Sequence, residues 1–510
     1  MNPRPHKLIP PTFSPTPSRS PENAVGVLVV SDLSSNLDVI GVAIEPEGTV
    51  PAALGVDFAT LARTGFTGDA GQTLLLPQQN GPSYLAVGVG AADGRTAASL
   101  RDVVAAFARA AAKFSRIGID LHGTFPLAQE TIGQVIAEGA ILARYRYTPL
   151  KADPKNVPLV SLDILAAAGD AQAVTEGVRR GEILARAANL ARDLANTPPG
   201  HLTATDLGDV AIEVGAAHGL AVEVFDKQQL IELGCGGLLG VNAGSVEEPR
   251  MIQLRYTPTD AEGAPVEPTA HLALVGKGIM YDSGGISLKP SDPMHLAMKM
   301  DMAGAAAVLA AMTALSDLSC PTAVTAFLMC TDNMPSGSAT VLGDVLTLRG
   351  GTTVEVKNTD AEGRLVLSDA LVLASEEQPD AIVDIATLTG AAMMALGTKT
   401  AAVLGNDQGV IDQAIASSKA TDESIWQLPL ERSYRKQLDS DVADISNMGG
   451  RFAGATIAAL FLADFVGEIP WAHLDIAGTM QVDADESWRS KGATGFGTRL
   501  LIDLAENFQK

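Results

Sequence analysis

The stretch Asn358-Thr359-Asp360-Ala361-Glu362-Gly363-Arg364-Leu365 contains two carboxylates and a guanidinium within five residues, at every second position. Apolar and charged residues alternate from 354 to 357, which predicts the end of a half-buried strand. The apolar run from 365 to 374 predicts a buried helix. The acidic cluster is therefore expected at a strand-to-helix turn, where α/β sheets bind ligands. Two acids this close repel each other unless a cation lies between them, and oxygen ligands suit a divalent metal.

The string Thr-Asp-Ala-Glu-Gly also occurs at residues 259–263. That copy lies among prolines, has Ala264 where the arginine would stand, and is not followed by an apolar run. It is predicted to be a solvated loop between two strands. The string alone is therefore not specific, and the specificity of the 358–365 stretch comes from Arg364 and from the strand and helix around it.

Length and composition limit the kind of protein. The chain has 510 residues, which predicts two domains. Its formal net charge of −23 repels nucleic acid and anionic membrane surfaces, so neither is expected as a partner. Three cysteines without a CxxC pattern indicate a reducing compartment and argue against disulfides. With seven histidines and no HExxH, a metal site must be built from carboxylates. No transmembrane segment or signal peptide is predicted, so the expected location is the cytoplasm.

The chain is predicted to fold in four parts. Residues 1–23, rich in Pro and Ser, predict a disordered tail. Strands and helices alternate in residues 24–170, which predicts a smaller α/β domain with an edge strand at Leu159–Ala166. Residues 171–195 predict a helix that bridges the domains. Residues 196–510 predict a larger domain, in which a mixed sheet is covered by helices on both faces.

Individual elements are also predicted from the apolar pattern. The strands include Gly26–Val30, Leu272–Val275 and Ala381–Ala386, and the helices include Ala303–Leu315. The strand Leu272–Val275 is followed by a glycine-rich segment that carries Lys277. Its glycine spacing is neither that of a Walker A loop nor GxGxxG, so the segment is not predicted to cradle phosphates.

Each candidate residue has a structural explanation when it is taken alone. A lone lysine is usually solvated, Asp301 could cap its helix, and Met298 could fill the core. Their joint placement points to chemistry, because five ionisable residues fall just after apolar strands or at helix starts, where one crevice of an α/β sheet is lined. Four carboxylates there would suit a site with two metals about 3.5–4 Å apart. The five residues are Lys277, Asp282, Asp301, Asp360 and Glu362.

The chain resembles the leucyl aminopeptidases of the M17 family, also called cytosol aminopeptidases. The octapeptide at 358–365 is identical to that family's signature. Four more segments match the family: GKGIMYDSGG at 276–285, NTPP at 196–199, ATLTGA at 386–391 and WAHLDIAG at 471–478. The strong similarity covers residues 196–504. The first domain resembles the family's more variable, macro-domain-like N-terminal domain in outline.

The resemblance implies a site with two divalent metal ions. Asp282 and Glu362 would bridge them. Lys277, as a neutral amine, and Asp301 would complete the tightly held position, and Asp360 would complete the exchangeable one. The metals would be Mn²⁺ or Zn²⁺, with Mg²⁺ and Co²⁺ as further choices, because oxygen ligands do not decide between them.

The resemblance also implies catalytic and substrate-binding roles. Lys289 would hydrogen-bond the scissile carbonyl oxygen, and Arg364 would hold a bicarbonate ion that acts as the general base. Eight residues would line the substrate pocket: Met298, Asn358, Ala361, Thr387, Leu388, Gly390, Ala477 and Met480.

The implied function is removal of N-terminal residues, leucine preferred, from peptides, by a water that the two metals activate, in intracellular peptide turnover. The implied assembly is a homohexamer of two stacked trimers. Two alternatives remain open on the residues themselves. A two-metal phosphoesterase would use similar carboxylates, although such sites usually add histidines. A non-catalytic scaffold would be expected to have lost ligands, and none is missing here.

Overall fold

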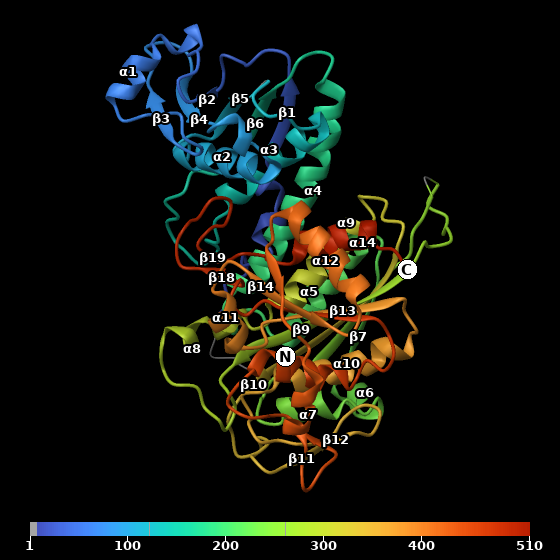
Figure 1. Cartoon of the computed structure of the whole chain (residues 1–510). Coiled ribbons are helices and arrows are strands. Elements are labelled where there is room, and N and C mark those ends of the chain that lie inside the picture. The colour runs from blue at the N-terminus through green and yellow to red at the C-terminus, as the bar shows by residue number, and fades with distance from the viewer. Residues whose placement is uncertain (1–7, 122, 261) are drawn as a thin grey trace. The chain divides into compact units, whose positions relative to one another are not determined.

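The computed structural model describes residues 8–121, 123–260 and 262–510, which form two compact units (Figure 1). The N-terminal unit consists of Thr16–Asn189 and Val482–Gly492. The C-terminal unit consists of Leu190–Gln481, Ala493–Lys510 and the described part of Met1–Pro15. The chain passes from one unit to the other inside helix α4 (Ala171–Asn196), the predicted bridging helix. Residues 1–7 of the predicted tail lie outside the described residues. Its described part includes two short 3₁₀ helices, η1 (Pro17–Arg19) and η2 (Pro21–Asn23).

The N-terminal unit is built on a six-stranded sheet in the order β1-β6-β5-β2-β4-β3. Neighbouring strands are parallel except β3 and β4. The strands are β1 (Gly26–Val30), β2 (Val39–Ile44), β3 (Thr73–Leu76), β4 (Ser83–Gly88), β5 (Arg116–Asp120) and β6 (Ser161–Leu165), and the helices are α1 (Phe58–Arg63), α2 (Ala97–Ala110) and α3 (Gln129–Arg144). The predicted edge strand, β6, is an interior strand. That prediction was wrong because β1 pairs with its outer side.

A segment from late in the sequence completes the N-terminal unit. Trp488, within Val482–Gly492, is fully buried in the hydrophobic cluster that also contains Val104 of α2 and Ile136 of α3. Arg109 donates hydrogen bonds to the carbonyl oxygens of Ser487 (2.6 Å) and Arg489 (2.7 Å). The predicted second domain, 196–510, includes this segment, because an eleven-residue insertion gives no local sign of where it packs.

The C-terminal unit contains an eight-stranded mixed sheet in the order β15-β14-β17-β13-β9-β10-β8-β7. The strands are β7 (Ala221–Phe225), β8 (Arg250–Tyr256), β9 (His271–Asp282), β10 (Ala323–Asn333), β13 (Ala381–Ala386), β14 (Ala401–Gly405), β15 (Ile425–Gln427) and β17 (Trp471–Asp475). Smaller sheets join β11 (Val345–Thr347), β12 (Thr353–Glu355) and β16 (Ile445–Ser446), and β18 (Gln481–Val482) with β19 (Gly492–Ala493). The central strands β17, β13, β9 and β10 are parallel, so their carboxyl ends lie at one edge of the sheet.

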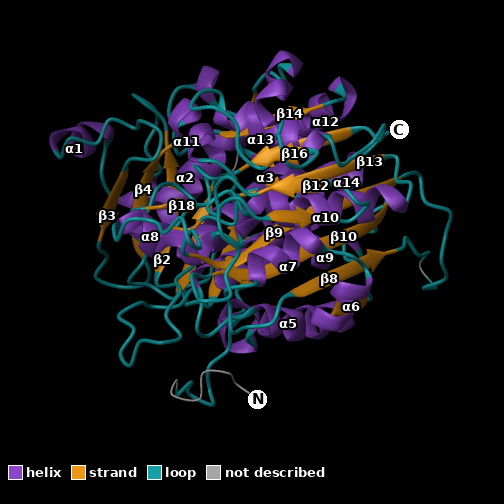
Figure 2. Ribbon diagram, turned by 90° about the horizontal axis from the view of Figure 1, so that it is seen from below, coloured by secondary structure: helices purple, strands orange, loops and turns teal. Residues whose placement is uncertain are grey.

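Helices cover both faces of this sheet, as predicted (Figure 2). They are α5 (Ala204–Ala217), α6 (Lys227–Glu232), α7 (Gly236–Asn242), α8 (Pro293–Ala297), α9 (Ala303–Leu315), α10 (Gly363–Glu376), α11 (Gly390–Leu396), α12 (Gln408–Thr421), α13 (Gly454–Ala463) and α14 (Thr498–Asn507). Strand β9 is the central element. Its Val275 shares a hydrophobic cluster with Val366 of α10, whereas a Cβ at the next residue, Gly276, would lie 2.7 Å from Cα of Ala305 in α9. The two helices therefore pack on opposite faces of β9.

The second copy of the five-residue string forms the loop between β8 and β9, as predicted. Thr259 and Pro265 form an isolated antiparallel bridge, and the carboxylate of Asp260 accepts hydrogen bonds from the amides of Glu262 (3.1 Å) and Ala264 (2.8 Å). The described residues of the copy, Thr259, Asp260, Glu262 and Gly263, are exposed, and Ala261 lies outside the described residues. The carboxylate of Asp260 therefore stabilises the turn of its own loop.

One apolar helical stretch is longer than the helix predicted from the sequence. Pro293–Leu315, which runs from α8 to α9, is long and apolar enough to cross a membrane by length and composition. Within it, an apolar segment of 18 residues is 83% buried. Since α9 packs against β9, this stretch has the burial expected of a core helix.

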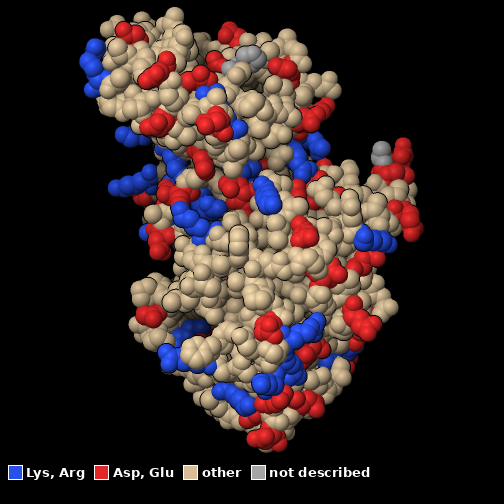
Figure 3. All heavy atoms as spheres, viewed as in Figure 1, with Lys and Arg blue, Asp and Glu red and all other residues tan. Residues whose placement is uncertain are grey.

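On the surface shown in Figure 3, acidic and basic side chains are interspersed.

Asp369 anchors α10 from within the core. Its Oδ2 accepts a hydrogen bond from the amide of Leu238 in α7 (2.9 Å), and its Oδ1 accepts one from the amide of Arg349 (2.9 Å). Burial raises the pKa of Asp369 from 3.8 to about 7, against the lowering effect of these amides. The folded state therefore binds this proton more tightly than the unfolded state does. The resulting stabilisation is present below about pH 4 and is lost as the pH rises through 7.

We expect this titration to appear in a comparison of the native chain with Asp369→Asn. The measured quantity is the free energy of unfolding of the native chain minus that of Asp369→Asn. This difference should fall by about 2–3 kcal/mol between pH 5 and pH 8, because only the native chain must ionise a buried carboxyl. Thermal unfolding across this pH range measures the difference. The exposed Asp441 provides the control, since Asp441→Asn should leave the pH dependence unchanged. A constant difference between the native chain and Asp369→Asn would contradict the account.

Candidate active site

Strand β9 carries the first site residue, Lys277, in its interior. The strand predicted from the sequence ends before Lys277. That prediction was wrong, because the glycines beside Lys277 continue the strand instead of ending it. A Cβ at Gly276 would meet α9, and a Cβ at Gly278 would lie 2.7 Å from the carbonyl oxygen of Met329 in β10. These glycines therefore let neighbouring elements approach Lys277 closely.

The ammonium of Lys277 lies among acidic groups and is only 2% exposed. Its Nζ is 2.8 Å from Oδ1 and Oδ2 of Asp301 and 2.8 Å from Oε1 of Glu362, and it donates to the carbonyl oxygen of Thr387 at 2.8 Å. Burial alone would lower the pKa of Lys277, but the charges of Asp301, Glu362 and Asp282 outweigh burial and raise it. The neutral amine that a metal ligand requires would therefore depend on the opposing charge of bound cations.

Asp301 follows the 3₁₀ helix η5 (Met298–Met300) and faces Lys277. It does not cap α9, whose N-cap residue is Met302. Its Oδ1 also accepts a hydrogen bond from Oγ1 of Thr387 (2.6 Å). Its Oδ2 is 2.8 Å from the ammonium of Lys277. The helix-capping explanation of Asp301 is thus replaced by an ion pair with Lys277, which also contacts Glu362.

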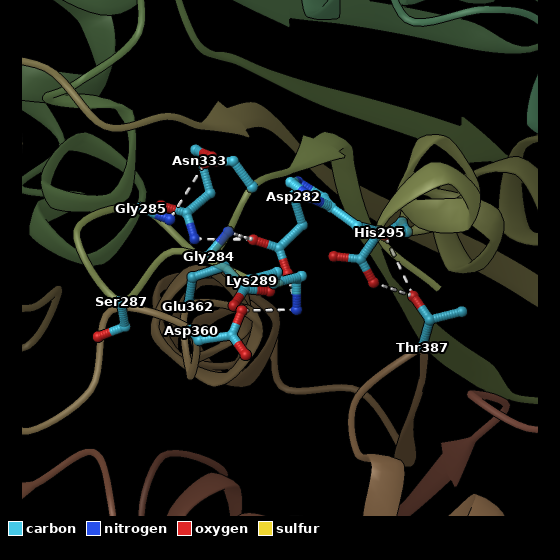
Figure 4. Close-up of polar contacts among 12 residues, drawn as sticks. Asp282, Gly284, Gly285, Ser287, Lys289, His295, Asn333, Asp360, Glu362 and Thr387 are labelled. Atoms are coloured by element: carbon cyan, nitrogen blue, oxygen red, sulfur yellow. Dashed lines mark hydrogen bonds and ion pairs between the residues drawn. The ribbon is translucent and has the colours of Figure 1, made fainter. Parts of the chain in front are cut away.

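Asp282 ends β9, beside an irregularity in the pairing with β10. The register between the two strands shifts at Thr331 and Asp332, so that Asp282 pairs with Asn333. Such bulges redirect side chains near functional sites. The side-chain amide of Asn333 donates to Oδ1 of Asp282 at 2.8 Å, as Figure 4 shows.

The signature stretch enters the same site between β12 and α10. Asp360 and Glu362 precede Gly363, the first residue of α10. A Cβ at Gly363 would lie 2.7 Å from Cε and 2.8 Å from Nζ of Lys277. A glycine is therefore needed here so that the helix start can reach the lysine.

Three carboxylates converge closely enough to hold a metal ion. One oxygen each from Asp282, Asp360 and Glu362 lies within 4.8 Å of the others, and Figure 4 shows these side chains directed toward one another and toward Lys289. Burial, followed by the charge of Asp282, raises the pKa of both Asp360 and Glu362. Buried acids that repel one another and offer oxygen donors fit a divalent cation.

Lys289 lies across this group of acids. Its Nζ is 2.8 Å from Oδ2 of Asp282 and 2.5 Å from Oδ1 of Asp360. Burial lowers the pKa of Lys289, but the charge and hydrogen bond of Asp282, together with Asp360, raise it overall. Lys289 is thus held as a cation at the more open side of the site, with its side chain 18% exposed.

Arg364 is the second residue of α10 and is 7% exposed. Its Nη1 donates to the carbonyl oxygen of Asn447 (2.9 Å), and its buried Nε donates to none of the described residues. Burial lowers the pKa of Arg364 to about 10, against the charges of Glu362 and Asp475. A guanidinium with an unused donor can hold an anion.

Several predicted pocket residues are tied into the same loops. Leu388 and Ala477, which follow β13 and β17, both donate their amides to Oδ1 of Asp475 at 3.2 Å. The amide of Asp360 donates to Oδ1 of Asn358 (2.9 Å). Met298, Ala361 and Met480 are buried, whereas Gly390 is exposed, and their part in binding substrate remains a prediction.

Sequence reasoning missed Asn447, which clamps the signature loop. Its Oδ1 accepts from the amide of Lys357 (2.8 Å), and its Nδ2 donates to the carbonyl oxygen of Asn358 (2.7 Å). Asn447 is fully buried. The one available signal was an asparagine two residues before a glycine pair in the stretch 443–450, and that signal does not reveal which loop the asparagine contacts.

Acids from β9 and the start of α10, with two lysines beside them, fit a metal-dependent hydrolase centre. The comparisons with known proteins agree. The model for the "Cytosol aminopeptidase family, catalytic domain" matches residues 189–502, and that for the family's N-terminal domain matches residues 59–154. The chain belongs to the cytosol aminopeptidase family and is a metal-dependent aminopeptidase.

Similar proteins align over nearly the whole chain. A probable cytosol aminopeptidase of Streptomyces avermitilis is 43% identical, over 93% of this chain and 96% of its own length. One from Roseiflexus castenholzii is 40% identical, over 95% and 99%. The solved structure of the bottromycin maturation enzyme BotP in complex with Mn is 39% identical, with a TM-score of 0.84, and covers 93% of this chain and 100% of that chain. The matches to the family's two domains and this structural alignment agree with the two-domain α/β fold.

We expect Gly363→Ala to lower aminopeptidase activity at least about tenfold, because the new methyl group would have to displace the Lys277 ammonium or the start of α10. Gly337→Ala is the matched control, since a Cβ there meets nothing within 4 Å. Steady-state kinetics on an aminoacyl anilide measures both variants. Equal activity in the two would show that the close approach of Gly363 to Lys277 does not matter for function.

Proposed function

We propose that this chain removes N-terminal residues, leucine preferred, from intracellular peptides, with two divalent metal ions in each subunit. The observation that carries the proposal is the convergence of Asp282, Asp360 and Glu362 within 4.8 Å, beside the Lys277–Asp301 pair. This set offers more oxygen donors than one ion needs when water and substrate also bind. It includes no histidine, which makes the set unlike that of a typical two-metal phosphoesterase.

The ligands divide between two positions. Asp282 and Glu362 would bridge the ions, Lys277 and Asp301 would complete one position, and Asp360 the other. When bound, the ions would polarise the peptide carbonyl and activate water. Manganese fits because the solved relative BotP is described in complex with Mn, and zinc is the second choice.

Two basic residues of the chain would act on the substrate and on the proton. Lys289, kept positive by Asp282 and Asp360, would donate to the scissile carbonyl oxygen and stabilise the negative charge that develops there. Arg364 would hold the bicarbonate that serves as general base, through the Nε that donates to none of the described residues.

The substrate pocket and the assembly follow the family. Met298 and Met480 would give an apolar pocket. The other residues around it would be Asn358, Ala361, Thr387, Leu388, Gly390 and Ala477. Flexible thioether side chains suit leucine-like residues. We place the enzyme in the cytoplasm as a homohexamer, in keeping with relatives that are named cytosol aminopeptidases.

The repeated string supplies a matched test of the metal site. We expect the native chain to hydrolyse leucine p-nitroanilide after incubation with Mn²⁺, and the double variant Asp360→Ala, Glu362→Ala to lose at least about a thousandfold in kcat/KM. The double variant Asp260→Ala, Glu262→Ala removes the same acids from the exposed copy and should keep native activity. Native protein that hydrolyses an aryl phosphate but no aminoacyl anilide would reverse the assignment.

The pocket assignment makes a separate prediction. Met480→Trp should lower kcat/KM for a leucyl anilide about tenfold or more, because the larger ring fills space that the leucyl side chain needs. An alanyl anilide, whose side chain is smaller, should lose less. Steady-state kinetics with both substrates measures the ratio. Unchanged values for the leucyl substrate would place Met480 outside the pocket.

A further inference from the structure

Asn333 connects the two segments that supply the acidic cluster. It ends β10, is 4% exposed, and is the register partner of Asp282. Its Nδ2 donates to Oδ1 of Asp282 at 2.8 Å and to the carbonyl oxygen of Thr359 at 2.9 Å. Thr359 immediately precedes Asp360, so one amide group holds both the end of β9 and the signature loop.

These contacts decide which oxygen of Asp282 faces the site. Oδ1 accepts a second hydrogen bond, from the amide of Gly284 at 2.8 Å. Oδ2 lies on the other side, 2.8 Å from Nζ of Lys289. With two donors on Oδ1, the carboxylate cannot rotate without breaking hydrogen bonds to two different segments. Oδ2 therefore stays directed toward Lys289 and Asp360.

Asn333 is itself fixed in place. Its carbonyl oxygen accepts from the amide of Ser283 (3.0 Å) and from Oγ of Ser283 (2.7 Å). A second link runs parallel to it, from Oγ1 of Thr359 to the carbonyl oxygen of Gly284 (2.7 Å). The two ligand-bearing segments are therefore joined as one rigid piece, in which Asn333 provides the link to a carboxylate.

We propose that Asn333 is a positioning residue of the metal centre: its side-chain amide holds Asp282 so that Oδ2 is presented to the metal, and ties Asp282 to the segment that carries Asp360. The inference rests on the proposed function, since it takes Asp282 as a metal ligand. Hydrogen bonds that orient ligating carboxylates typically change metal affinity or activity 10–100-fold when removed.

Direct binding of Mn²⁺ tests the inference without relying on turnover. In metal-stripped protein, the electron paramagnetic resonance signal of free Mn²⁺ gives the dissociation constant. Asn333→Leu keeps the branched shape of the side chain and Asn333→Ala shortens it. Both lose the donor without adding a charge, so both should weaken Mn²⁺ binding about 10–100-fold. Asn333→Ala decides the test if Asn333→Leu does not fold. Asn242→Leu is the matched control, because Nδ2 of the buried Asn242 also donates twice, to the Glu247 carbonyl oxygen and to Thr331.

The outcomes separate this inference from the proposed function. Weakened Mn²⁺ binding in the folded Asn333 variants but not in Asn242→Leu supports the positioning role. Dissociation constants within about threefold of native in the Asn333 variants, while Asp282→Ala loses binding, would overturn the role of Asn333 and leave the metal site intact. Native Mn²⁺ binding in Asp282→Ala would overturn the proposed metal site itself.

Discussion

The site depends on the burial of like charges in a small volume. Asp282, Asp301 and Glu362 are buried and Asp360 is half-buried beside them, so solvent screens their repulsion poorly and the arrangement is stable only with positive charge among them. The chain supplies part of that charge through Lys277, in contact with Asp301 and Glu362, and bound divalent cations would supply more. Metal affinity and the raised pKa of Asp360 and Glu362 would therefore be two results of one electrostatic constraint.

Close packing makes this constraint possible. A lysine can reach the acids from inside a central strand because the neighbouring backbone comes unusually near. The lack of a side chain at Gly276 lets α9 pack closely, and the lack of one at Gly363 lets the start of α10 approach Lys277. Gly304 of α9 belongs to the same arrangement, because a Cβ there would lie 2.1 Å from the carbonyl oxygen of Ile385 in β13. The glycines thus serve the approach of helices to the sheet, and the approach in turn positions the charges.

The sequence predicted the elements whose signals are local. The bounds of β1, β13 and α9 agree with the predicted strands Gly26–Val30 and Ala381–Ala386 and the predicted helix Ala303–Leu315. Of the predicted constellation, Lys277 does contact both Asp301 and Glu362. What could not be predicted depends on distant partners. Asn447 bonds to a residue 90 positions away, and Trp488 packs into a unit formed by residues far earlier in the chain.

Anomalous X-ray diffraction at the manganese absorption edge, from crystals of the Mn²⁺-loaded enzyme, tests the central claim most directly. The account predicts two anomalous peaks per subunit, both lying among Lys277, Asp282, Asp301, Asp360 and Glu362. A single peak, or peaks away from these side chains, would contradict the claim that the buried charges form a two-metal centre.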